Sequence, residues 1–76
     1  MGVDLYSEAM ETRLQAARRH AAVGERIVTR LERIIDELRR DGHDTEVAED
    51  LLRSTRAMLA EMRADVARRE GEAGSP

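Results

Sequence analysis

The chain has 76 residues, a formal net charge of -3, no cysteine and a single aromatic side chain, Tyr6. One small domain is the most that this length allows, and without cysteine no disulfide can compensate for a small core, so we expect a reducing compartment. No apolar run approaches the roughly 20 residues of a membrane-spanning helix, and the first residues carry Asp4 and Glu8 where a signal peptide would be basic, so we expect a cytoplasmic protein.

The first predicted element is a long amphipathic helix from about Ser7 to Asp41. Small or apolar residues recur in it at alternating steps of four and three, which is the spacing of a heptad seam. Because Gly24 costs about 1 kcal/mol relative to Ala inside a helix, we expect it to permit the close approach of another helix. The seam consists of Met10, Leu14, Ala17, Ala21, Gly24, Val28, Leu31, Ile35 and Leu38.

The segment Arg39 to Thr45, RRDGHDT, is predicted to end this helix and begin another. Gly42 can adopt the left-handed conformation that ends a helix, and Asp44 or Thr45 can accept hydrogen bonds from the first free amides of the next one. The second helix is predicted from about 45 to 69, and the tail at 70–76 is expected to be disordered. The seam of the second helix is predicted as Ala48, Leu51, Thr55, Met58 and Met62.

A connection this short makes the two helices antiparallel neighbours. Seam residues of the first helix then lie at the same height as seam residues of the second, as Ile35 does with Leu51 and Gly24 with Met62. Neither helix shows the alternation that is typical of a strand. The sequence therefore predicts an all-α fold, a single antiparallel two-helix hairpin within residues 1–69.

The apolar stripe of each predicted helix is wider than one neighbouring helix can cover. About three apolar positions per heptad are typical of a helix inside a bundle. Since an isolated hairpin of this size usually needs a disulfide, a metal or self-association, we predict a homodimer that forms a four-helix bundle. The residues predicted for its core and dimer interface are Leu14, Ile27, Val28, Ile34, Ile35, Leu52, Leu59 and Val66.

Two further features predict contacts with a partner. The first helix is predicted to be the longer one, which leaves an uncovered overhang with the side chains of Leu5, Tyr6, Met10 and Leu14. An arginine stripe also runs along its outer face, where an acidic protein surface or RNA phosphates could bind, although the lack of aromatic side chains for base stacking weakens the case for RNA. A simpler interpretation is a solvated face whose arginines pair with acids of the second helix, in the same chain or in another copy. The stripe consists of Arg19, Arg26, Arg33 and Arg40, spaced by seven residues, with Arg30 beside them.

The sequence predicts no catalytic residue, no cofactor and no metal site. His20 and His43 are the only histidines, and neither has the Glu-x-x-His neighbourhood that builds metal sites in helical bundles. The acids around the turn lack the spacing of a calcium loop and are more simply explained by the positive end of the second helix dipole. His20 continues the row of Ile27 and Ile34, either at the rim of the core or opposite its own symmetry mate. We predict that the protein is not an enzyme.

Three short motifs carry a family resemblance: HAAVGER from His20 to Arg26, DGHDT from Asp41 to Thr45, and the pair Leu51-Leu52. At this spacing they resemble an HxxxGER, DGHDT, LL signature of uncharacterised small bacterial proteins. The resemblance covers about residues 19–60 and implies a helical hairpin, with no activity or functional residue to carry over. In that signature an aromatic residue and a histidine follow the leucine pair, whereas residues 55–62 contain neither.

The leading functional hypothesis is a non-enzymatic interaction or scaffold module that homodimerises and presents a charged surface, or its Tyr6 end, to a protein partner. The main alternative is a small nucleic-acid-binding regulator that binds RNA through the arginine stripe. A third possibility is an antitoxin or inhibitor whose overhanging first residues dock on an enzyme. No membrane partner is expected.

Overall fold

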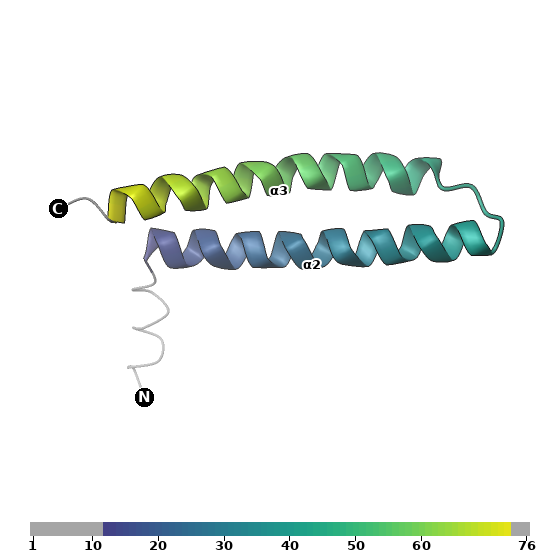
Figure 1. The fold of residues 1–76 in the computed structure, drawn as a ribbon, viewed down its shortest axis with the longest axis horizontal. Coiled ribbons are helices and arrows are strands. Elements are labelled where there is room, and N and C mark those ends of the chain that lie inside the picture. The colour runs from purple at the N-terminus through teal and green to yellow at the C-terminus, as the bar shows by residue number, and fades with distance from the viewer. Residues whose placement is uncertain (1–11, 74–76) are drawn as a thin grey trace, which may run out of the picture.

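The computed structural model describes residues 12–73, which form two α-helices packed against each other and contain no strand (Figure 1). Helix α2 spans Arg13–Arg40 and helix α3 spans Glu46–Ala73, and each has 28 residues. The chain reverses direction between them, so Arg13 and Ala73 lie at the same end of an elongated hairpin. The predicted all-α class and the packing of two helices are confirmed.

Helix α2 begins later than the heptad pattern predicted, at Arg13 instead of near residue 7. Thr12 has an extended backbone, with ψ of 159°, and it caps the helix. The hydroxyl of Thr12 accepts a hydrogen bond from the Gln15 amide at 3.0 Å, and the Thr12 amide donates to Gln15 Oε1 at 2.9 Å. In this reciprocal capping box, side chains accept the hydrogen bonds of the Thr12 and Gln15 amides, whose partners in a longer helix would be backbone carbonyls. The capping box therefore fixes the start of the helix.

The turn forms as the residues of RRDGHDT predict. Gly42 has a positive φ of 74°, and the His43 amide donates to the carbonyl of Leu38 at 2.9 Å, which closes α2 in a left-handed C-cap. Asp44 then accepts a hydrogen bond from the Glu46 amide at 3.0 Å and so starts α3. His43 is exposed in this turn.

Helix α3 continues to Ala73, past the predicted end at 69 and into the segment that was expected to be disordered. Glu70 lies within this extension and pairs with Arg18 of α2 at 3.7 Å, so a contact between the helices persists there. Because the described parts of α2 and α3 have equal length, they contain no overhang. Leu5, Tyr6 and Met10, which were predicted to form one, lie outside the described residues. The prediction is wrong for Leu14, which is half-buried in α2.

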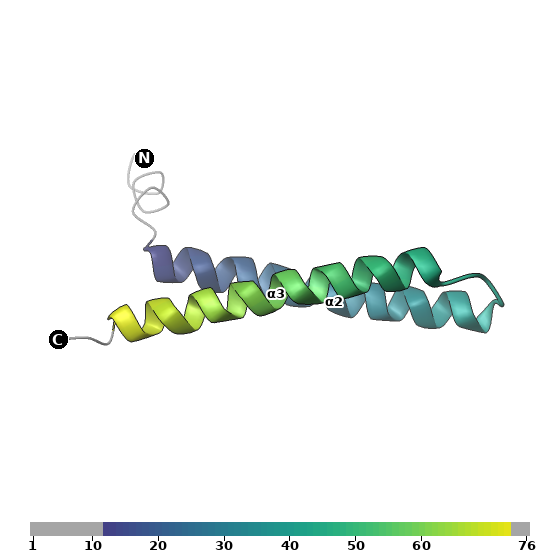
Figure 2. The same cartoon turned by 90° about the horizontal axis from the view of Figure 1, so that it is seen from above.

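The core lies along a single seam between the helices, which cross at a shallow angle (Figure 2). On α2 the small residues Ala17, Ala21 and Gly24 are buried toward the open end and Ile35 toward the turn. On α3 the buried residues are Leu52, Thr55 and Leu59. Small residues on one helix opposite large ones on the other let the backbones approach, as the contact of Gly24 with Leu59 and Met62 shows.

The predicted seam of α3 was wrong at two positions. Leu51 and Met58 were assigned to it, but their side chains are 53% and 52% exposed, whereas their neighbours Leu52 and Leu59 are 8% and 5% exposed. Both Leu51-Leu52 and Met58-Leu59 offer an apolar side chain at two adjacent positions, so apolar spacing alone fits either rotation of the helix. The rotation that the structure adopts brings charged residues of α3 opposite oppositely charged residues of α2.

Within residues 12–73, neither helix has an apolar stretch of the length that a membrane span requires.

Candidate interaction surface

A ladder of ion pairs joins α2 to α3 along one flank of the seam. Each step of seven residues forward on α2 is matched by a step of seven residues back on α3, so the ladder follows the heptad repeat in antiparallel order. Along α2 the signs run positive, negative, negative, positive, and α3 presents the complement. The ladder consists of Arg18 with Glu70, Glu25 with Arg63 at 3.2 Å, Glu32 with Arg56 at 3.0 Å, and Arg39 with Glu49.

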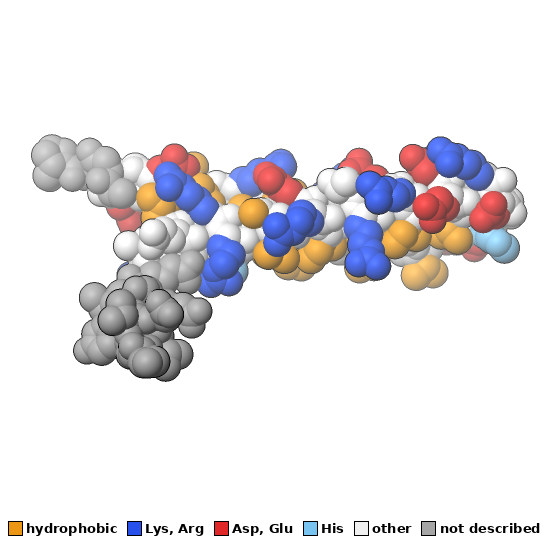
Figure 3. All heavy atoms as spheres, turned by 90° about the horizontal axis from the view of Figure 1, so that it is seen from below, with side chains coloured by type: hydrophobic (Ala, Val, Ile, Leu, Met, Phe, Trp, Pro, Cys, Tyr) orange, Lys and Arg blue, Asp and Glu red, His pale blue; other side chains and the backbone are white. Residues whose placement is uncertain are grey.

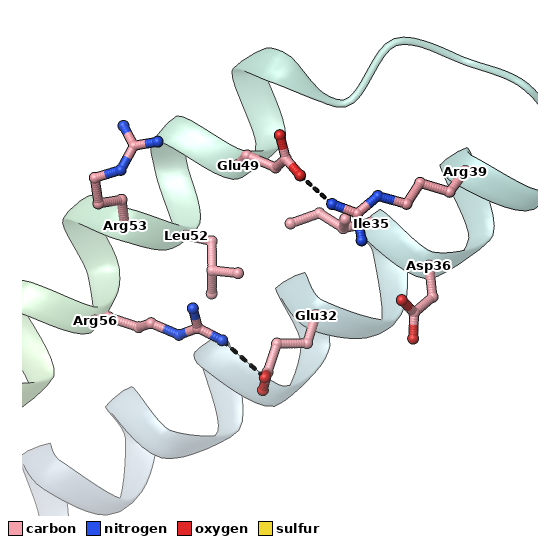
Figure 4. Close-up of a pocket in the computed structure, with 8 residues that line it drawn as sticks. All are labelled: Glu32, Ile35, Asp36, Arg39, Glu49, Leu52, Arg53 and Arg56. Carbon is pink, nitrogen blue, oxygen red and sulfur yellow. Dashed lines mark hydrogen bonds and ion pairs between the residues drawn. The ribbon is translucent and has the colours of Figure 1, made fainter.

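Two rungs of this ladder cover the core near the turn (Figure 4). The side chains of Arg39 and Glu49 meet above Ile35, and those of Arg56 and Glu32 meet beside Leu52. These residues line a shallow groove, and the charged groups that reach across it are paired with each other. All of the ladder side chains are at least 38% exposed, so each pair contributes about 0.2–1 kcal/mol. The ladder therefore specifies register more than it adds stability.

The opposite flank of the seam is apolar. Ladder residues follow a seam residue by one position, whereas Ile27, Ile34, Leu51 and Met58 each precede one, which places them on the other side of both helices. These four side chains, with Val23 and Val47 beside them, are called the apolar face below. Their exposed fractions are 46% for Ile27, 38% for Ile34, 53% for Leu51, 52% for Met58, 39% for Val23 and 82% for Val47.

The apolar face follows one flank of the hairpin. Figure 3 shows hydrophobic side chains gathered along one long edge, beside arginines. Within residues 12–73 these six are all of the large hydrophobic side chains that are exposed, and all of them lie on or beside this flank. Apolar side chains exposed singly are common on protein surfaces, whereas large contiguous apolar patches are typical of interaction sites.

The apolar face ends in ionisable residues at the open end of the hairpin. His20 and Asp65 line a shallow hollow together with Met58 and Glu61. Asp65 Oδ2 accepts a hydrogen bond from Arg69 Nε at 3.0 Å, and Arg68 also pairs with this carboxylate. The hydrogen bond from Arg69 is the main reason that the pKa of Asp65 lies below its ordinary value. Asp65 is thus engaged within α3, and His20 is exposed at the rim of the seam.

The arginine stripe lies on the outer face of α2, away from α3. Arg26, Arg30 and Arg33 line a shallow hollow with Glu25 and Thr29. Glu25 is engaged by Arg63 of α3, and within residues 12–73 none of these three arginines has an ion pair. Arg19 does make an interaction of its own. Arg18 and Arg39, which pair with acids of α3, belong to the ladder and not to the stripe. Pairing of the stripe with α3 of the same chain is therefore not seen for Arg26, Arg30 or Arg33 within residues 12–73.

The residues predicted for the core and dimer interface fall into three groups. Ile35, Leu52 and Leu59 are buried in the seam, and Leu14, Val28 and Val66 are half-buried along it. Ile27 and Ile34 lie on the apolar face. Of the residues predicted to bind a partner, Arg19, Arg26, Arg30 and Arg33 are exposed on α2, and Leu5, Tyr6 and Met10 lie outside the described residues.

The ladder is the feature that sequence reasoning missed. Its signal is present in the sequence, because Arg18, Glu25, Glu32 and Arg39 recur every seven residues and meet opposite charges when the second helix is read backwards.

Comparison with protein-family models, curated proteins and solved structures found no match to the chain.

Proposed function

We propose that the protein is a non-enzymatic helical interaction module that homodimerises through its apolar face into a four-helix bundle. The observation that carries this proposal is the contrast between the two flanks of one seam. One flank is closed by complementary charges within the chain, whereas the other exposes Ile27, Ile34, Leu51 and Met58. A second hairpin that stacks on this flank would bury all four side chains and turn a two-helix seam into a bundle core.

The thinness of the hairpin core supports the same proposal. No large side chain within residues 12–73 is less than 2% exposed, so each helix still faces water on one side of every core layer. Small domains without disulfides or metals usually gain the missing burial by oligomerisation. The one buried polar side chain in this range, Thr55, donates its hydroxyl to the carbonyl of Leu51 at 2.8 Å and is thereby satisfied.

Light scattering or sedimentation at micromolar concentration tests the proposal, with an expected mass of two chains. The double variant Ile34→Glu with Leu51→Glu is expected to sediment as one chain, because each glutamate would be buried without a partner in the dimer. The matched control is Ala22→Glu with Ala57→Glu, since both alanines are exposed away from the apolar face. A wild-type protein that is helical, heat-resistant and of single-chain mass at this concentration would refute the proposal.

The arginine stripe supports the proposal of a second binding surface, separate from the dimer interface. Arg26 and Arg33 have no ion pair within residues 12–73, and they lie on the outer face of α2, away from the apolar face. We propose that this surface binds an acidic patch of a protein partner. Changing Arg26 and Arg33 to glutamine should abolish capture of such a partner and leave the dimer mass unchanged.

Binding of RNA is the alternative role for the same stripe. It predicts that the logarithm of the binding constant falls with the logarithm of salt concentration, with a slope of about -0.7 for each phosphate contacted on a single strand. Changing Arg19, Arg26 and Arg30 to glutamate without any effect on measured RNA binding would exclude the stripe as the site. A role for residues 1–14 in an antitoxin or inhibitor contact remains a proposal, which deletion of residues 1–11 tests through loss of the partner complex with an intact dimer.

A further inference from the structure

We infer that the second copy docks on the apolar face in the opposite direction, with the turn of each hairpin at the open end of the other. This inference rests on the proposed dimerisation and adds its orientation. Two stacked hairpins related by a twofold axis can place their turns at the same end or at opposite ends, and both arrangements cover the same apolar side chains. Burial of the apolar face therefore does not decide between them, and the distribution of charge does.

The turn end of the hairpin is strongly acidic. Residues 36–50 contain seven acids, Asp36, Glu37, Asp41, Asp44, Glu46, Glu49 and Asp50, against two arginines, Arg39 and Arg40. The open end is much less acidic, because residues 12–20 contain three arginines and no acid, and residues 61–73 contain three arginines against four acids. Turns at the same end would bring two strongly acidic ends together, whereas turns at opposite ends set each acidic end beside the less acidic open end of the other copy.

The apolar face itself fits a twofold axis across the hairpin. With turns at opposite ends, α2 stacks on α2 and α3 on α3, so Ile27 of one copy faces Ile34 of the other and Met58 faces Leu51. One heptad farther out, His20 of each copy comes level with Asp41 of the other. The interface is then isologous, with each contact made twice.

In each orientation some side chains of like charge lie at the same height on the two copies. The orientations differ in whether ion pairs within each chain already neutralise those charges. With turns at opposite ends, Asp65 meets Asp44, but Arg68 and Arg69 already pair with Asp65. With turns at the same end, Asp41 meets Asp44, and within residues 12–73 neither of these has an ion pair. With turns at opposite ends, Arg30 of one copy also lies level with Arg30 of the other, near the twofold axis. These two side chains are long and exposed, so they can extend into solvent away from each other.

Single cysteine variants distinguish the orientations, because the chain has no cysteine of its own. Arg30 and Ser54 are exposed and lie beside the apolar face near its midpoint. With turns at opposite ends each residue faces its own counterpart, so Arg30→Cys alone and Ser54→Cys alone should each form a disulfide-linked dimer on mild oxidation. With turns at the same end Arg30 faces Ser54, so neither single variant should crosslink efficiently, but an equal mixture of the two should.

The control is Ala22→Cys, which lies away from the apolar face and should stay monomeric on a denaturing gel. Light scattering on the reduced variants separates the two proposals. A single-chain mass would overturn the proposed dimer itself. A two-chain mass with crosslinking only in the mixture would overturn the orientation and leave the dimer standing. A two-chain mass without crosslinking in the single variants or the mixture would overturn both the orientation and dimerisation through the apolar face, because the copies would then meet on another surface.

Discussion

Gly24 of α2 lies directly against Leu59 of α3: a Cβ added at Gly24 would be 3.1 Å from Leu59 Cδ1 and 3.2 Å from Met62 Sδ. Both atoms belong to the flexible outer parts of their side chains, so they can move by the few tenths of an ångström that an alanine needs. Gly24→Ala is therefore expected to stabilise the protein by up to about 0.5 kcal/mol, because the gain of about 1 kcal/mol in helix propensity exceeds the cost of repacking.

Urea denaturation followed by circular dichroism measures this change, and Gly24→Leu provides the contrast. A leucine would have to displace Leu59 and Met62 altogether, so we expect a loss of about 1–3 kcal/mol. Destabilisation of Gly24→Ala by more than about 1 kcal/mol would mean that Leu59 is held too firmly in the seam to yield.

The ladder predicts that charges can be exchanged between the helices. Glu32→Arg places two arginines together and should cost up to about 1 kcal/mol, as should Arg56→Glu. The double variant restores an ion pair with reversed sign and should recover most of the loss, with a coupling energy of about 0.2–1 kcal/mol in a double-mutant cycle. Salt at 1 M should shrink this coupling. Arg53 and Asp50, which pair within α3, are the control, since their reversal should show no coupling to Glu32.

The turn predicts opposite effects of alanine at two glycines. Gly42 has φ of 74° and no atom within 4 Å of an added Cβ, so Gly42→Ala should cost about 1 kcal/mol through backbone strain alone. Gly71 is equally open but lies within α3, so Gly71→Ala should stabilise by about 0.5–1 kcal/mol. Thermal unfolding of the two variants side by side tests the signs. Equal effects would indicate that the left-handed C-cap does not form in solution.

The helix boundaries at the turn could be predicted because the determinants are local. Gly42 supplies the left-handed residue and Asp44 supplies the cap, and both act within a few residues of their own position. The start of α2 was predicted too early because the apolar spacing continues through Met10, although Thr12 and Gln15 form a capping box that the sequence also contains. Local hydrogen bonding outweighed hydrophobic periodicity at that point.

The rotation of α3 about its axis could not be predicted from apolar spacing, because Leu51 and Leu52 both fit a heptad. Only the contact between the helices distinguishes them, through the ladder on one flank and the wider burial of Leu52 and Leu59. The same limit applies to the candidate site. Ile27 and Ile34 were recognised as flanking the seam, but the apolar face as a whole required the positions of Leu51 and Met58.

Asp65 predicts a dependence of stability on pH. Its pKa in the folded protein lies below the ordinary value of about 3.9, first because Arg69 donates a hydrogen bond to the carboxylate. A carboxyl with a lowered folded pKa stabilises the protein above its unfolded pKa, and this contribution is lost as the pH falls through the folded pKa. Asp65→Asn should therefore lower the melting temperature at pH 7, and this difference should shrink as the pH falls through the folded pKa. Glu61→Gln is the control, and an equal effect of both substitutions at pH 7 would point to net charge as the cause.

Removal of the buried Thr55 hydroxyl from the seam is predicted to stabilise the protein. Its side chain is buried, and its hydroxyl donates to the carbonyl of Leu51, a group that the helix backbone also bonds. Thr55→Val keeps the shape, leaves no buried group unpaired and adds an apolar methyl to the core, so we expect stabilisation of about 0.5–1 kcal/mol in urea unfolding.

Thr29 is the matched control for this substitution, because it makes the same hydrogen bond, to the carbonyl of Glu25 at 3.0 Å, on the exposed side of α2. Thr29→Val should change stability by less than about 0.5 kcal/mol, since its new methyl group stays in water. An equal gain at both sites would assign the effect to helix propensity. A gain at Thr55 alone would place that side chain in the packed seam between α2 and α3, because only burial distinguishes the two threonines.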